Sequence, residues 1–228
     1  MSYLIAEVLV ADLVKAIKSA SIFAGSKDVG RNYDYVRIER GHPDSLYLLA
    51  GDQYQVAAVC IDADVLPDNT DHPAIYVTTE SLKAALTTPT LKPGRTKPTV
   101  QLRWEEGMGL ALVRNDLGTD RVYLTTAYDT SPLPPAFQKP LPPIDWDCII
   151  EVENPSRFAV GPELITKVAR AAWNNTDAVI VESGGTPHSP ITLRIGTYLV
   201  AVLAPKDGRN GNPTTTVPND ISTRRSWH

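Results

Sequence analysis

The sequence is poor in cysteine, histidine and long apolar runs. Its 228 residues include two cysteines, four histidines and three phenylalanines, and aromatic residues make up 7% of the chain. The longest apolar runs, such as residues 199–205, are far shorter than the roughly 20 residues needed to span a bilayer. Charged residues at positions 12, 15 and 18 interrupt any signal-peptide pattern near the N-terminus. We therefore expect a cytoplasmic protein with no membrane partner.

The residues that usually carry catalysis or bind metals are also scarce. Cys60 and Cys148 each lie in an apolar run without a second cysteine nearby. We therefore expect both to be small buried side chains, and not disulfide partners or metal ligands. The histidines lack metal-ligand spacing, and the chain has no nucleotide-binding loop and no serine-nucleophile motif. The expectation is a protein without enzymatic activity, cofactor or metal.

The chain contains enough apolar residues to form a hydrophobic core. The hydrophobic share is 43%, the charged share is 21%, and the formal charge is −4. Such a composition is typical of a folded chain and excludes a mainly disordered one.

The order of predicted elements repeats three times along the chain. Each copy consists of a strand, a helix and a meander of three antiparallel strands, over about residues 4–62, 74–127 and 149–203. The helices are expected at residues 11–20, 80–87 and 163–173, with Thr79 as the cap of the second and Pro162 in the first turn of the third. The pattern predicts an α+β fold with antiparallel sheets outside and helices on one face.

A proline-rich segment separates the second copy from the third. Residues 130–147 contain six prolines, which disfavour a helix or an inner strand, so the segment is predicted to be a connector. The predicted organisation is a first domain over residues 1–129 with two units and a second over residues 148–206 with one clear unit. Residues 207–228 lack periodicity and are predicted to be a flexible tail.

The basic residues of this acidic chain gather on the predicted helices. The helix faces that the apolar periodicity leaves exposed carry five cations, namely Lys15, Lys18, Lys83, Lys167 and Arg170. Three acidic residues, Asp12, Glu80 and Glu163, lie near the N-terminal ends, where the helix dipole favours negative charge. This distribution suits contact with a polyanion without sequence reading. The alternative is that these lysines are ordinary solvated surface.

Three stretches of sequence carry a family resemblance. The first is residues 31–39 with residues 49–57, in which Asp52 and Ala57 keep the family's turn pattern; the second is residues 137–146; the third is residues 189–195 with residues 198–205. Together with the repeats, they resemble the DNA sliding clamps, both the bacterial β clamp and the proliferating cell nuclear antigen type, over about residues 4–206. The resemblance implies the DNA-clamp fold.

The resemblance also implies a function. In the family, twelve helices line a ring around duplex DNA and their cations contact phosphates without reading bases. The five helix cations named above would be those contacts here. DNA polymerase and the clamp loader would bind through short peptides in a pocket formed by Gly51, Tyr54, Val56, Leu203 and Pro205.

Clamp domains contain two units each, so three units leave two possibilities. A fourth unit is hidden in the sequence, or a shortened clamp completes a domain through a partner. The leading hypothesis is a homo-oligomeric processivity factor of viral origin, in a bacterial or infected host cytoplasm. The alternative is a clamp-fold regulator that binds a replisome component without encircling DNA, and a third reading is an enzyme of unrecognised type.

Overall fold

The structure, a computed structural model, describes residues 2–25, 33–41, 44–52, 55–64, 74–94, 96–114, 116, 121–126, 162–183 and 191–203. The described residues form three helices and eleven strands, which are β1 (Ser2–Leu9), α1 (Val10–Phe23), β2 (Tyr35–Gly41), β3 (Ser45–Gly51), β4 (Gln55–Asp62), β5 (Ile75–Thr78), α2 (Thr79–Ala85), β6 (Thr99–Glu105), β7 (Gly109–Val113), β8 (Arg121–Leu124), α3 (Pro162–Ala171), β9 (Val179–Ser183), β10 (Ile191–Ile195) and β11 (Leu199–Leu203). The strand predicted at the start of the third copy, the connector and the tail lie outside these ranges.

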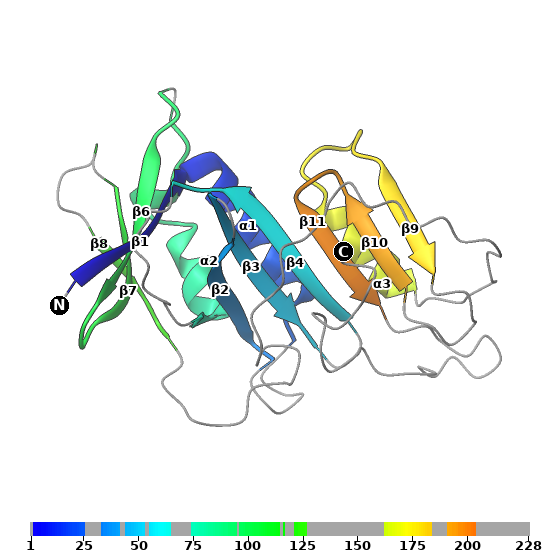
Figure 1. Ribbon diagram of the computed structural model, residues 1–228, viewed down its shortest axis with the longest axis horizontal. Helices are drawn as coiled ribbons and strands as arrows, with labels where there is room; N and C mark the ends of the chain where they lie inside the picture. The colour runs from blue at the N-terminus through cyan, green and yellow to red at the C-terminus, as the bar shows by residue number, and fades with distance from the viewer. Residues whose placement is uncertain are drawn as a thin grey trace.

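The strands form two antiparallel sheets. One has the order β1-β6-β7-β8, and the other has the order β5-β2-β3-β4-β11-β10-β9. Figure 1 shows the larger sheet running across the molecule, with α1 and α3 behind it and the smaller sheet at the left. The predicted α+β class with antiparallel sheets is confirmed.

The first two units exchange strands. The first strand of unit one, β1, pairs with β6 of unit two, and the first strand of unit two, β5, pairs with β2 of unit one. Their helices α1 and α2 also contact each other. The two units therefore form one interlocked body in which each completes a sheet of the other.

The third unit joins this body through its last strand. β11 pairs with β4 from Leu199 opposite Val59 to Leu203 opposite Gln55, with Ala201 facing Ala57 at the centre. Strands that precede and follow the predicted connector thus share one sheet. The domain boundary at residues 130–147 stays a prediction, since that segment is outside the described ranges.

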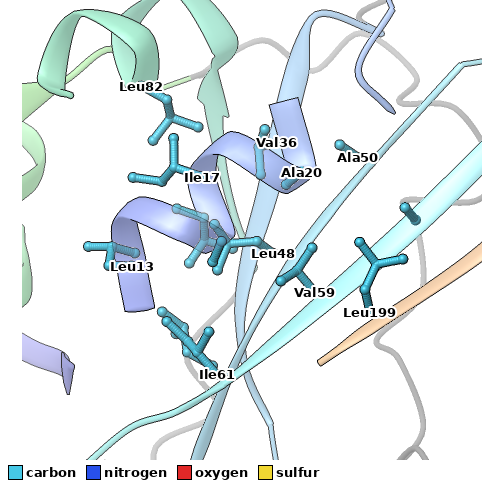
Figure 2. Close-up of a cluster of buried hydrophobic side chains, with 14 of the residues drawn as sticks. Leu13, Ile17, Ala20, Val36, Leu48, Ala50, Val59, Ile61, Leu82 and Leu199 are labelled. Carbon is cyan, nitrogen blue, oxygen red and sulfur yellow. The ribbon is translucent and has the colours of Figure 1, made fainter. Parts of the chain in front are cut away.

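The core lies between the helices and the inner faces of both sheets. Leu13, Ile17 and Ala20 recur at spacings of four and three, so they share one face of α1 and are all buried. Figure 2 shows this face against Leu48 of β3 and Val59 of β4, with Leu199 of β11 beside them. α1 packs on β3 and β4 of unit one and on α3 of unit three. It therefore joins the first body to the third unit and is the central helix of the fold.

Two local predictions are wrong. The cap of α2 is Thr78 and not Thr79: the Thr78 side chain accepts a hydrogen bond from the Ser81 amide at 3.2 Å. Thr78 also pairs with Tyr35 at the end of β5, which holds it in the extended conformation that a cap requires. Cys60 is only half-buried on β4, where burial raises the pKa of its thiol; it is a free thiol. Cys148 lies outside the described residues.

In the part of the chain that the structure describes, no helix is both long and apolar enough to cross a membrane.

Candidate functional site

The five helix cations lie on exposed or half-exposed positions of three neighbouring helices. Lys15 and Lys18 are three residues apart on α1, and Lys167 and Arg170 have the same spacing on α3, so each pair follows one stripe of its helix. Lys83 is exposed on α2. Both α2 and α3 contact α1. The structure therefore brings all five predicted cations onto one continuous group of helices.

Two of these cations are already engaged within the chain. The Lys15 ammonium is 3.7 Å from the Asp12 carboxylate and 5.0 Å from the centre of the Trp173 ring, which is within the range of a cation–π contact. The Lys167 ammonium is 3.6 Å from the Asp52 carboxylate. Among the described residues, Lys18, Lys83 and Arg170 have no ion pair, so their charges face solvent.

The net charge of the helices is small. The five cations share the helices with Asp12, Glu80 and Glu163, so the helices carry a net charge of +2. All three acids are in first turns, where they complement the helix dipoles and lie apart from the last-turn residues Lys83 and Arg170. Such a surface attracts a polyanion weakly through a few cations.

Asp52 links α3 to the turn between β3 and β4. Its carboxylate accepts hydrogen bonds from the backbone amide of Gln55 at 3.1 Å and from the Gln55 side-chain amide at 2.9 Å. The Asp52 amide in turn donates to the Gln55 carbonyl at 2.8 Å. The Lys167 ammonium therefore contacts a turn that is held closed from both sides.

The predicted partner pocket is located at the same end of the sheet. Gly51 lies opposite Val56, and Val56 lies opposite Val202, next to Leu203. Leu203 faces Gln55 and belongs to the core, whereas Val56 is one position along β4 and points to the other face of the sheet. All three are buried, and Tyr54 and Pro205 lie outside the described residues. The structure thus places Gly51, Val56 and Leu203 at neighbouring positions of adjacent strands. The side chains of Val56 and Leu203, however, lie on opposite faces of the sheet.

The junction between α1 and the third unit depends on residues that the sequence analysis did not single out. The Ser19 hydroxyl of α1 donates to the Ala171 carbonyl at the end of α3 at 2.7 Å and accepts from the Trp173 indole at 3.2 Å. Trp173 stacks on Tyr198, with ring centres 4.0 Å apart. Ser19 lies beside the apolar stripe of α1, which is the one signal in the sequence that it is buried.

A short hydrogen-bond chain fixes Tyr198. Its hydroxyl accepts from the Trp173 amide at 2.8 Å and donates to the Asp177 carboxylate at 2.5 Å. Burial, followed by this bond to Asp177, raises the pKa of Tyr198 to about 12. The same bond, together with the Asn174 amide, lowers the pKa of Asp177. The contacts hold α3 and the turn before β11 in one arrangement against α1.

No group of three or more acidic, histidine or cysteine residues that could hold a metal ion occurs among the described residues. The five cations and three acids of the described helices support electrostatic contact at this surface.

The architecture is that of the DNA sliding clamps. The structure resembles the DNA polymerase sliding clamp of Pseudomonas aeruginosa with a TM-score of 0.59 at 10% identity, over 91% of this chain and 66% of that one. It resembles the β subunit of DNA polymerase III from Thermotoga maritima with a TM-score of 0.56 at 12% identity, over 88% of this chain and 64% of that one. The chain thus spans just under two thirds of the length of these proteins, and the predicted clamp fold is confirmed.

Sequence comparison adds little to this result. No protein-family model matches the sequence. An alignment 102 positions long with Rho GTPase-activating protein 17 of Rattus norvegicus shows 35% identity, and it covers 41% of this chain and 11% of that protein. That share is too small to define a family, so the fold carries the classification.

Proposed function

We propose that this chain is a sliding-clamp-like processivity factor, which encircles duplex DNA and tethers a polymerase to it. The observation that carries the proposal is the single group of helices α1, α2 and α3, with five cations on its outward stripes, on the clamp fold. Lysine and arginine contact phosphates without regard to sequence, so a ring lined by them holds DNA and still slides. The described part of the chain contributes three helices, so four copies would supply twelve.

The proposal assigns different roles to the five cations. Lys18, Lys83 and Arg170 face solvent and are placed for direct phosphate contact, whereas Lys15 and Lys167 first have to leave Asp12 and Asp52. Few contacts of this kind keep affinity low and strongly dependent on salt. Low affinity is useful for a sliding protein, because the ring topology, and not the strength of each contact, retains it on DNA.

Polymerase and a clamp loader would bind through short peptides where β3 and β11 end and β4 begins. The protein would act without catalysis, in a bacterial or infected host cytoplasm. Because Leu203 and Val56 point to opposite faces, a peptide on either face would contact only one of them directly. The face that carries Val56 and Val202 is the better candidate because the opposite face packs into the core; both valines are themselves buried, so a peptide would have to displace the residues that cover them.

A second candidate is a clamp-fold regulator that binds a replisome component without encircling DNA. The observation in its favour is the weak helix charge, with two of five cations already paired to acids of the same chain. Such a protein would need only its partner-binding face.

End-capped linear DNA separates the two candidates without a loader, because a ring can thread over a free end. Protein is incubated with linear duplex DNA, the ends are blocked with bound protein, and the complex is washed at moderate salt. A clamp is retained on capped DNA and lost from uncapped DNA. Equal retention on both, or none on either, contradicts the proposal and favours the regulator.

Matched double variants test the role of the helix charges. Lys18→Glu with Lys83→Glu is expected to reduce retention on capped DNA at least tenfold, because both substitutions put a negative charge where phosphate approaches. Lys92→Glu with Lys97→Glu makes the same charge change at exposed positions outside the helices and is expected to retain DNA as the parent does. Equal loss in both variants would assign the effect to net charge alone.

A further inference from the structure

The indole ring of Trp173 lies between two groups that belong to different units. Tyr198 of unit three stacks on one face of the ring, with ring centres 4.0 Å apart and ring planes inclined by 13°. The Lys15 ammonium of unit one lies 5.0 Å from the centre of the same ring. Rings stacked at 4.0 Å are in van der Waals contact and leave no space for an ammonium group between them. Lys15 therefore lies on the other face, and Trp173 presents that face to α1.

Three hydrogen bonds keep this ring in place. The Trp173 indole donates to the Ser19 hydroxyl of α1 at 3.2 Å, and the Trp173 amide donates to the Tyr198 hydroxyl at 2.8 Å. The Tyr198 carbonyl in turn accepts from the Cys60 amide of β4 at 2.8 Å. Both rings of the stack are thus bonded to unit one, and the face toward Lys15 cannot turn away without loss of these bonds.

Among the described residues, the other partner of Lys15 is Asp12. The ammonium and the carboxylate are 3.7 Å apart, and the two side chains are 45% and 31% exposed. An exposed pair of this kind is weak. An ammonium group carries three N–H donors, and contact with a ring face does not require that all of them point at the ring. Lys15 can therefore leave Asp12 for a phosphate and stay over Trp173.

The location of Lys15 makes this contact important for the whole group of helices. Lys15 is one turn before Ser19 on α1, and the Ser19 hydroxyl donates to the Ala171 carbonyl at the end of α3. Lys15 thus lies where the cations of α1 meet the end of α3, which carries Arg170 in its last turn. A group that fixes Lys15 here also fixes its position relative to the cations of unit three.

We propose that Trp173 is a positioning residue for phosphate contact, which holds the Lys15 ammonium at the junction of units one and three. The inference rests on one part of the proposed function, the contact of the helix cations with DNA. A side chain that is already held in its binding position loses less conformational freedom on binding. Without the ring, Asp12 is the described partner that remains, and its carboxylate competes with phosphate for the same ammonium.

The first test is equilibrium binding of a short labelled duplex DNA, measured by fluorescence anisotropy over a series of salt concentrations. The logarithm of the affinity falls with the logarithm of the salt concentration by about 0.9 for each neutralised phosphate. Lys15→Met is expected to reduce this slope by about 0.9. Trp173→Leu is expected to reduce it equally, although it removes no charge. Trp173→Phe retains a ring face and is expected to keep the parent slope.

A control and a rescue separate positioning from a purely structural role. Trp104→Leu substitutes another half-buried tryptophan, on β6, and is expected to leave the slope unchanged. Asp12→Asn added to Trp173→Leu is expected to restore the parent slope, because it removes the competing carboxylate. Trp173→Leu added to Lys15→Met is expected to have no further effect on the slope, because both substitutions act on the same contact.

The second test needs no DNA. In the NMR spectrum of the parent chain, the ring current of Trp173 is expected to shift the Lys15 ε-methylene protons upfield, and Lys15→Met assigns their signal. Trp173→Leu is expected to abolish the shift, and Asp12→Asn is expected to keep it. Absence of the shift in the parent overturns the proposal even if Trp173→Leu does not fold.

The proposal is also overturned by a slope that Trp173→Leu leaves unchanged or that Asp12→Asn does not restore. Retention on end-capped DNA together with such slopes would contradict this inference alone. The expected slopes together with equal retention on capped and uncapped DNA would contradict the proposed function and support the role of Trp173. A parent chain that binds no duplex at any salt concentration would contradict both.

Discussion

Helices α1 and α3 occupy equivalent positions in their units but have very different surroundings. α1 has eight buried residues out of fourteen, whereas α3 has three out of ten. α1 contacts α2, α3 and strands of both sheets, whereas among the described elements the main contact of α3 is with α1. A helix with more packed neighbours has a wider apolar stripe. The narrow apolar stripe of α3 therefore indicates that unit three has fewer packed neighbours than unit one.

The largest expected difference between the two helices is in core truncation. Ile17→Ala on α1 is expected to lower the free energy of unfolding by about 2–5 kcal/mol, because Ile17 is 1% exposed and its neighbours on two sides cannot collapse into the cavity. Val168→Ala on α3 removes two buried methyl groups, at about 0.8 kcal/mol each. Urea unfolding measures both. Equal losses would contradict the view that α1 is the central helix of the fold.

The junction between the two helices is expected to contribute less. Ser19→Ala removes the hydroxyl that joins the Ala171 carbonyl and the Trp173 indole, and is expected to cost about 1–2 kcal/mol. Ser21→Ala on the same helix is the matched control: the Ser21 hydroxyl is buried and has no hydrogen-bond partner among the described residues. The control is expected to be neutral or slightly stabilising. A loss in Ser21→Ala as large as that in Ser19→Ala would show that the hydroxyl bonds do not matter.

The smallest expected effect is a pH dependence of stability specific to unit three. The folded pKa of Tyr198 is raised to about 12, above the value near 10 of an unfolded chain. The unfolded chain therefore loses this proton first, so the stabilisation is complete below about pH 10 and is lost as pH rises through about 12. Tyr198→Phe is expected to lose less stability than the parent over that window in urea unfolding. Parallel profiles would contradict the assignment, since both proteins share every other tyrosine.

Most secondary structure could be predicted from periodicity and turn residues. The order of a strand, a helix and three strands is confirmed in the first two units, and the helix at residues 80–87 differs from α2 by one residue at the start and two at the end. The cap of α2 was missed by one position because Thr78 and Thr79 are chemically equivalent candidates. Only the pairing of Thr78 with Tyr35 selects between them, and this pairing joins residues more than forty positions apart.

The candidate site was predicted less completely, and the reason is again distance along the chain. Exposure of Lys18, Lys83 and Arg170 follows from local periodicity, which a sequence shows directly. The contact of Lys15 with Trp173 and the ion pair of Lys167 with Asp52 do not, because they form only through the packing of unit three on unit one. The opposite orientations of Val56 and Leu203 likewise depend on the register between β4 and β11, which local sequence does not specify.

The order of elements, the apolar stripe of each helix and the cations on the opposite stripe follow from the amino-acid sequence alone, because contacts between residues a few positions apart set them. Which strands pair, which distant groups hold Lys15 and Lys167, and which edge is left open among the described strands depend on tertiary packing. Those outcomes depend on how three similar units meet, and local sequence carries too little information to choose among the possible pairings. The exchanged strands β1 and β5 and the open strand β9 belong to similar units, and only their neighbours distinguish them.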